Sequence, residues 1–415
     1  MTKLKMSWKK LKPIVYRYLP YILIVLVAVG YYIYNSQYFG PILLTDEVGH
    51  VSKAGAFTGR MIDGASKYHS GYGILLIPVF WLIEDPFSLW QGIILSNSLM
   101  WAASAGLLWY ILRQFFPKKS PMTIFAVSLF GLVYPAYVGG GGLGRATSAV
   151  TLVFMLAVVA LLKSRVKNPY YLAGFSVMAG FIYWVHPTGI TVSMAAIAML
   201  ILFSIHYKSI RYIPYILVIL FMVGSYALFV DNWVNEALTP DGFKQLESAY
   251  ASDRYIADIA KPAYWYLWGT VFLGQLAYIL VSTFGLAAYA SQKIFELPKL
   301  GVKKAIKKIS TDPIYMTLFF VVISVIAMLL LSSKFMSGIP DEGQIKGTRL
   351  WIYGRYTGVL LLPLIGIGLL SKWKLKTAIY MIISVLLSGA ALQILAPRYS
   401  NLSNIRLGSI QSFWP

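Results

Sequence analysis

The residue types best suited to chemistry stand in one polar stretch, Thr45-Asp46-Glu47-Val48-Gly49-His50, which follows a long apolar run. A carboxylate at the edge of low-dielectric surroundings can have its pKa raised and then act as a general base. The alternative is structural, because adjacent acids also suit the first turn of a helix, and spacing alone favours this role. Neighbouring side chains on a helix point in different directions, so at most one of Asp46 and Glu47 would be the base.

Two of the four histidines, His50 and His69, lie in the connection that this stretch opens. Together with the acids they could bind a metal ion, but neither an HxxxH nor an HxH spacing supports such a site. A lone histidine in a loop is usually solvated or hydrogen-bonded. We therefore interpret His50 as a contact to a phosphate or to another part of a substrate, and we leave a divalent metal open.

Three further stretches combine cations, hydroxyl groups and glycines. They are Lys67-Tyr68-His69-Ser70-Gly71-Tyr72-Gly73, the turn from Gly139 to Arg145, and Ile352-Tyr353-Gly354-Arg355-Tyr356. Arginine suits a phosphate because its planar guanidinium group donates two parallel hydrogen bonds. An arginine at the end of an apolar helix is costly unless it reaches the interface or an anion. The structural alternatives are an interfacial turn, a flexible hinge and a topology anchor, respectively.

Composition identifies the elements that must position these residues. Of the 415 residues, 58% are hydrophobic and 12% are charged, whereas a soluble protein carries about 25% charged residues. The absence of cysteine excludes disulfides, thiolate metal sites and cysteine nucleophiles. Apolar runs long enough to cross a bilayer recur along the whole length. The sequence therefore predicts an all-α polytopic membrane protein, with residues 1–415 in a single transmembrane domain.

We expect about eleven transmembrane helices, the first of them a retained span rather than a cleaved signal peptide. They lie at roughly 14–34, 87–112, 121–138, 147–162, 169–185, 188–206, 212–230, 264–290, 313–333, 355–371 and 376–396. Most Lys and Arg residues fall on one side, and all 15 acids except Glu296 and Asp312 fall on the other. The positive-inside rule makes the basic side cytoplasmic. We expect a cytoplasmic N-terminus and an external C-terminus.

The net charge of +21 lies almost wholly on the predicted cytoplasmic side. Anionic membrane lipids explain this pattern, so lipids and not nucleic acid are the expected partners. The basic run Lys303-Lys304-Ala305-Ile306-Lys307-Lys308 is then a lipid-facing cytoplasmic loop. Functional side chains gather instead in the outer loops at 35–86, 231–263 and 334–354.

The first outer loop, 35–86, is predicted to hold two juxtamembrane helices. The segment 46–61 reads as a helix with Thr45 as its N-cap, and Asp46, His50 and Lys53 lie on the face opposite Val48 and the other apolar residues. The apolar run 74–83 is too short to cross a bilayer, which is typical of an interfacial or re-entrant helix. Both helices are expected to lie on the membrane, joined by 63–73.

Three stretches then resemble a known family. An acidic pair opens an outer helix and is followed by Tyr68-His69-Ser70-Gly71-Tyr72-Gly73-Ile74-Leu75-Leu76-Ile77-Pro78. The stretch Trp184-Val185-His186-Pro187-Thr188-Gly189-Ile190 links two middle spans, and Gly354-Arg355-Tyr356 precedes Leu360-Leu361-Leu362-Pro363. Together they look like the GT-C glycosyltransferases that use polyprenyl-phosphate sugars, the group that includes protein O-mannosyltransferases and aminoarabinose transferases. Where many relatives carry an acid at the entry to the fourth span, this chain has Arg145-Ala146-Thr147-Ser148.

The resemblance implies an inverting glycosyltransferase at the outer face of a bacterial plasma membrane. It would move a sugar from a polyprenyl-phosphate donor to a glycan, lipid or protein acceptor. Because the leaving phosphate needs little protonation, one base is enough, and cations must stabilise the departing charge. The runner-up is a transporter or flippase for a lipid-linked saccharide, which would predict charges at mid-membrane depth and repeats between the two halves.

We expect Asp46 to be the base, with Glu47 as the second choice or as a partner that orients substrate or binds a metal. The phosphate of the donor would meet Arg355 first, and His50, Lys67 and Arg145 are weaker candidates for the same contact. The candidates for substrate binding are His69, Tyr72 and Tyr356.

Overall fold

The structure is a computed structural model of the chain. It describes residues 2–37, 45–60, 68–134, 137, 144–238, 262–336, 355–372 and 375–398, and within these residues every regular element is a helix. The α-helices are α1 (Thr2–Asn35), α2 (Thr45–Thr58), α3 (Gly71–Leu82), α4 (Pro86–Phe115), α5 (Pro121–Leu132), α7 (Thr147–Ser164), α8 (Pro169–Val185), α9 (Ile190–Tyr207), α10 (Ile213–Ser225), α11 (Asp231–Leu238), α14 (Pro262–Ser282), α15 (Leu286–Phe295), α16 (Val302–Thr311), α17 (Pro313–Met336), α18 (Arg355–Gly358), α19 (Leu362–Leu370) and α20 (Leu375–Arg398).

Seven helical segments in the described part of the chain are long and apolar enough to cross a membrane. They are Lys12–Asn35, Pro86–Phe115, Thr147–Ser164, Pro187–Tyr207, Ile210–Val234, Tyr264–Ser282 and Pro313–Lys334. Each coincides with an expected span. The prediction of an all-helical membrane protein is therefore confirmed.

The count of eleven crossings stays a prediction, because the remaining expected spans are shorter or interrupted. The helix expected at 121–138 ends at Leu132, and that at 355–371 is divided into α18 and α19. The span expected at 264–290 breaks after Ser282, where Phe284 and Gly285 take left-handed backbone conformations with φ of 48° and 72°. α8 and α20 match the other two in position.

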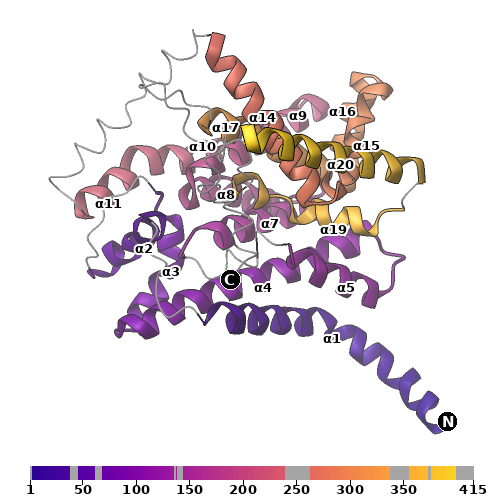
Figure 1. The fold of residues 1–415 in the computed structure, drawn as a ribbon, viewed down its shortest axis with the longest axis horizontal. Helices are drawn as coiled ribbons and strands as arrows, with labels where there is room; N and C mark the ends of the chain where they lie inside the picture. The colour runs from indigo at the N-terminus through magenta and orange to yellow at the C-terminus, as the bar shows by residue number, and fades with distance from the viewer. Residues whose placement is uncertain are drawn as a thin grey trace.

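The middle of the molecule is an apolar core between α7, α8 and α17. The rings of Phe154 and Phe175 lie 5.9 and 5.1 Å from that of Phe320, and all three side chains are fully buried. Along one side of this core α4 packs against α7, and α1 runs along α4 (Figure 1). Large apolar side chains such as those of Phe221 and Phe229 are exposed, as expected for helices whose outer surface meets the hydrocarbon of a membrane.

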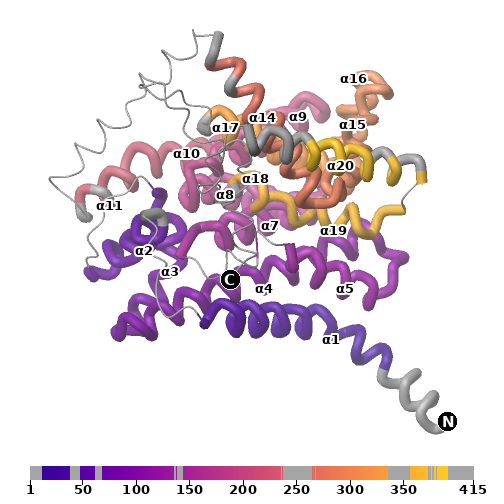
Figure 2. The backbone as a smooth tube through the Cα atoms, in the orientation of Figure 1, coloured from indigo at the N-terminus to yellow at the C-terminus, as the bar shows by residue number. Residues whose placement is uncertain are grey.

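The structure has two helices where two were predicted in the first loop, and their position on the membrane stays a prediction. α2 begins at Thr45 itself rather than after it. α3 begins at Gly71 and includes the run predicted at 74–83 except for its last residue, Ile83. α2 packs against α3 and α11, and α3 continues the packing to α4 and α8 (Figure 2). Arg60, just after α2, donates a hydrogen bond to the carbonyl oxygen of Ile83 at the end of α3. α2 and α3 thus pack against each other and, through α3, against the longer helices α4 and α8.

Candidate functional site

The polar face of α2 is turned into the protein. Glu47, His50 and Lys53 are fully buried, and their three-residue spacing places them along one side of the helix. On the side where the sequence places apolar residues, Val48 and Val51 are partly buried and Ala54 is fully buried. α2 packs against both α3 and α11. The side chain of Asp46 lies outside the described part of the structure.

Two glycines allow α3 to approach its neighbours this closely. A Cβ atom on Gly73 would lie 2.8 Å from the backbone nitrogen of Ala54 and 2.9 Å from Cβ of Lys53, both in α2. One on Gly71 would lie 2.5 Å from the carbonyl carbon of Trp184 in α8. Real Cβ contacts are not this short. Gly71 and Gly73 therefore allow α3 to pack closely against α8 and α2.

A cluster of rings surrounds the His50 imidazole. The ring of Tyr68 lies 4.4 Å from it, and the ring of Tyr72 meets it edge-on at 5.9 Å. On another side is His186, at 6.3 Å, whose ring lies 5.3 Å from that of Tyr356. The cluster therefore joins α2, the start of α3, the end of α8 and α18.

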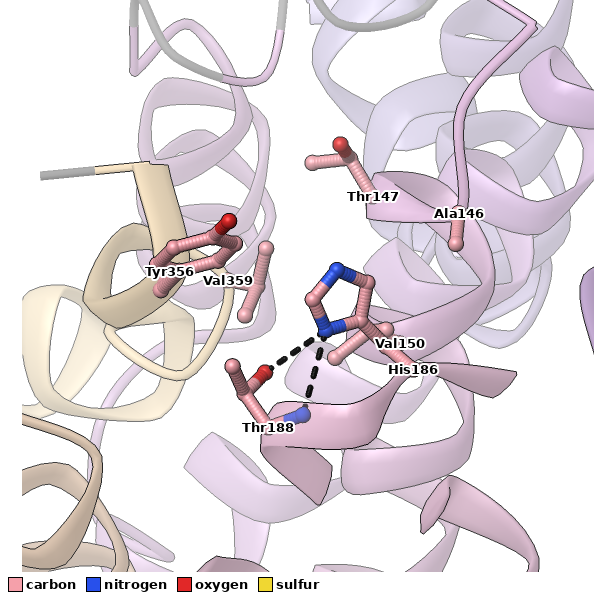
Figure 3. Close-up of a pocket in the computed structure, with 7 residues that line it drawn as sticks. All are labelled: Ala146, Thr147, Val150, His186, Thr188, Tyr356 and Val359. Atoms are coloured by element: carbon pink, nitrogen blue, oxygen red, sulfur yellow. Dashed lines mark hydrogen bonds between the residues drawn. The ribbon is translucent and has the colours of Figure 1, made fainter. Parts of the chain in front are cut away.

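His186 borders a pocket between α7, the end of α8 and α18 (Figure 3). Its empty volume, with the open mouth included, is about 280 Å³. The lining residues are Ala146, Thr147, Val150, His186, Thr188, Tyr356 and Val359. The backbone N–H of Thr188 donates to Nδ1 of His186, with 3.3 Å between the two nitrogens. Neutral His186 therefore carries its hydrogen on Nε2, the ring nitrogen that faces the hydroxyl groups of Thr147 and Tyr356 in Figure 3.

His69 lies near a second set of polar residues, which includes Lys53 of α2 and Asp231 of α11. Its Nδ1 lies 2.5 Å from the carbonyl oxygen of Tyr183, which can only accept, so Nδ1 carries the hydrogen. Burial lowers the pKa of the His69 imidazole to about 4, although the Tyr183 carbonyl and the Asp231 carboxylate raise it and Lys53 lowers it. His69 is therefore neutral at pH 7, and its Nε2 is a hydrogen-bond acceptor.

Lys53 and Asp231 link α2 to α11. Burial lowers the pKa of the Lys53 ammonium group to about 8, and the Asp231 carboxylate partly offsets this effect. The carboxylate also accepts a hydrogen bond from the Tyr226 hydroxyl at 3.2 Å, which in turn accepts one from the backbone N–H of Ser70 at 2.8 Å. Tyr226 opens a π-helical turn, Tyr226–Val230, a feature frequent at functional sites.

Below the ring cluster, Asn97 of α4 holds α3 and α7 in place. Its Oδ1 accepts hydrogen bonds from the Tyr72 hydroxyl at 3.0 Å and from the Ser148 hydroxyl at 2.7 Å. All three side chains are fully buried. Burial raises the pKa of the Tyr72 hydroxyl, and the nearby Glu47 carboxylate raises it further, so Tyr72 is held as a neutral donor.

The structure brings several of the expected site residues together. His50, Tyr72 and Tyr356 belong to the ring cluster or touch it through His186, while His69 points to the Asp231 side. Glu47 lies on the buried face of α2, and Arg145 is half-buried just before α7. Two other phosphate candidates, Lys67 and the side chain of Arg355, lie outside the described residues, although the backbone of Arg355 starts α18.

Sequence reasoning assigned no role to His186, Lys53, Tyr226 or Asp231. For Lys53 the signal was available, since it shares the three-residue spacing with Glu47 and His50. Tyr226 lies inside an apolar run, where nothing in the sequence separates it from lipid-facing aromatic residues. Its role follows only from the contact with Ser70, which is 156 residues away in the chain.

Among the described residues, no group of three or more His, Asp or Glu side chains is arranged to hold a metal ion. The side chain of Asp46 lies outside the described part of the structure, so a metal ion on the pair Asp46 and Glu47 stays an open prediction. What the described site offers is a buried carboxylate, the neutral imidazole of His69, and hydroxyl donors. No family model, no curated protein and no solved structure matches this chain.

Proposed function

We propose that this protein is an inverting glycosyltransferase that moves a sugar from a polyprenyl-phosphate donor to an acceptor at the outer face of a bacterial plasma membrane. One observation carries the proposal. The three stretches on which the resemblance to the GT-C enzymes rests are far apart in the sequence and adjacent in space. His50, beside Tyr68 and Tyr72 of the first stretch, contacts His186 of the second, which contacts Tyr356 of the third.

In the proposed reaction, a carboxylate of the pair Asp46 and Glu47 takes the proton from the acceptor hydroxyl. The acceptor oxygen then attacks the anomeric carbon from the face opposite the phosphate, and the bond from that carbon to the phosphate oxygen breaks. Polyprenyl phosphate leaves with the electron pair. A buried position suits such a base, because burial disfavours the charged carboxylate and so raises its affinity for a proton.

Cations and hydrogen-bond donors would stabilise the phosphate as it leaves. Arg355 and Arg145 are the candidates for this contact, with His50 and Lys67 as weaker ones. Nε2–H of His186 and the Tyr356 hydroxyl, at the pocket between α7 and α18, add hydrogen-bond donors. The neutral ring of His69 offers an acceptor for a sugar hydroxyl, and Tyr72 is the further candidate for the sugar. The N-terminus would be cytoplasmic and the C-terminus external.

The test uses the purified protein in proteoliposomes with radiolabelled sugars linked to polyprenyl phosphate, one sugar at a time, and a membrane extract as the source of acceptor. The proposal predicts label on the acceptor together with release of free polyprenyl phosphate. If the labelled donor crosses the bilayer with its sugar–phosphate bond intact, the chain is a flippase instead. Turnover with a nucleotide sugar and no polyprenyl phosphate would also contradict the proposal.

A further inference from the structure

The end of the molecule that carries α16 has a surface unrelated to the candidate site. Four lysines of α16, Lys303, Lys304, Lys307 and Lys308, fall within about 140° of its circumference at ~100° per residue. Lys303, Lys304 and Lys307 are exposed, and Lys308 lies over the ring of Tyr315 with its Nζ 4.1 Å from the ring centroid. Figure 1 shows α16 at the edge of the helix bundle, beyond α15.

α16 is fixed to the bundle by its other face. Ile309 is buried, and the Tyr207 hydroxyl at the end of α9 donates a hydrogen bond to the carbonyl oxygen of Ser310 at 2.9 Å. Tyr207 also stacks against Arg211, whose guanidinium carbon lies 5.5 Å from the ring centroid. The turn at 207–211 therefore adds exposed Lys208 and Arg211 beside α16. We call these six cations, Lys208, Arg211, Lys303, Lys304, Lys307 and Lys308, the basic surface.

Apolar side chains with high exposure accompany the basic surface. Val302 is 76% exposed and Ile210 is 80% exposed. Ile210 is the first residue of the candidate span Ile210–Val234. Val302 is the first residue of α16, and only Asp312 separates the end of α16 from α17, where the candidate span Pro313–Lys334 starts. A helix end that presents lysines and apolar side chains at the start of two spans has the composition of an interfacial membrane helix.

We propose that the basic surface binds the anionic headgroups of a phospholipid leaflet, with the exposed apolar residues inserted among the acyl chains. Charge complementarity identifies the occupant. The segment 291–312 contains six lysines but only two acids, Glu296 and Asp312, and Glu296 accepts a hydrogen bond from the side chain of Gln292. The proposal does not depend on the glycosyltransferase activity. Each basic residue near an anionic membrane contributes roughly fivefold in affinity at moderate ionic strength.

The experiment uses the full-length protein in a neutral detergent with equal amounts of phosphatidylglycerol and phosphatidylcholine, and counts the bound lipids by native mass spectrometry. We expect the wild-type protein to retain phosphatidylglycerol preferentially, and Lys303→Gln/Lys304→Gln to reduce that preference by roughly 10- to 30-fold. The matched control is Lys118→Gln/Lys119→Gln, which removes two exposed lysines from the α4–α5 connection and should leave the preference within twofold. Lys303→Arg/Lys304→Arg should retain it.

Three results would overturn the proposal. An unchanged preference in Lys303→Gln/Lys304→Gln would show that the lipids bind elsewhere. An equal loss in both glutamine variants would show that net charge acts without a local site. Displacement of phosphatidylglycerol by millimolar inorganic phosphate, at constant ionic strength, would identify a site for a free anion rather than a lipid surface.

Discussion

Replacement of Gly73 by alanine tests the close packing that holds the candidate site together. The added Cβ would lie 2.8 Å from the backbone nitrogen of Ala54 and 2.9 Å from Cβ of Lys53. Ordinary contacts between carbon atoms are about 3.5–4.0 Å, so α2 and α3 must move apart by roughly 0.6–1 Å. Such overpacking costs about 1–3 kcal/mol, against a gain of about 0.5–1 kcal/mol from replacing a helical glycine by alanine.

A matched control separates these two terms. Gly174 lies in α8, and nothing lies within 4 Å of the Cβ that alanine would add there. Gly174→Ala should therefore show only the gain, and the two variants should differ in unfolding free energy by about 1–3 kcal/mol. The difference can be measured by unfolding the purified protein in mixed micelles with increasing denaturing detergent, followed by tryptophan fluorescence.

The separation of α2 from α3 also displaces Glu47 and His50 from Tyr72. A misplacement of about 1 Å can reduce catalysis by roughly 100-fold, so we expect Gly73→Ala to lose sugar transfer and Gly174→Ala to keep it. If Gly73→Ala is as stable as Gly174→Ala or more so, the two helices do not pack as closely as described. The derivation of the site from that packing would then be wrong.

Three further predictions follow from single contacts. His186→Gln should lower the rate of sugar transfer at least tenfold, while His206→Gln at the far end of α9 should not change it; equal rates in the two variants would remove His186 from the site. Tyr72→Phe removes one donor to the Asn97 amide oxygen and should lower the unfolding free energy by about 1 kcal/mol. Tyr170→Phe, at a tyrosine of α8 that is 85% exposed, should cost less, so the reverse order would contradict the network. The pKa of His69 is about 4 in the folded state against 6.5 when unfolded, so the unfolded state binds more protons between these pH values. The unfolding free energy should therefore fall by about 3 kcal/mol as the pH drops from 6.5 to 4. His69→Phe should remove this part of the pH dependence, and an unchanged pH dependence would show that the folded state does not lower the pKa of His69.

The local pattern predicted the two helices of the first loop but not what covers them. The spacing of Glu47, His50 and Lys53 determines that they share a face, and it does so whether that face meets water or protein. Only the packing against α3 and α11 decides between the two, and this packing depends on contacts such as Ser70 with Tyr226 that connect distant segments. Apolar runs predicted most of the long helices for a related reason, since hydropathy is a local property.

The differences between the expected spans and the observed helix ends also have physical causes. Hydropathy continues from 264 to 290, but Gly285 takes φ of 72° and ends α14, and the sequence marked this position only by a single glycine. The run at 355–371 is apolar from Gly358 to Leu370 and nevertheless divides at 359–361, where the backbone turns between α18 and α19. Pro363, in the first turn of α19, suits a helix start and was the available signal.

The central claim is that a carboxylate in the pair Asp46 and Glu47 activates the acceptor, and the rate of sugar transfer in acid-to-amide variants tests it most directly. Asp46→Asn, Glu47→Gln and the control Glu84→Gln, an exposed acid in the same loop, are compared with the wild-type protein in proteoliposomes under single-turnover conditions. We predict that Asp46→Asn or Glu47→Gln loses about 10²- to 10⁴-fold in rate and that Glu84→Gln keeps it. Full rates in both Asp46→Asn and Glu47→Gln would contradict the account.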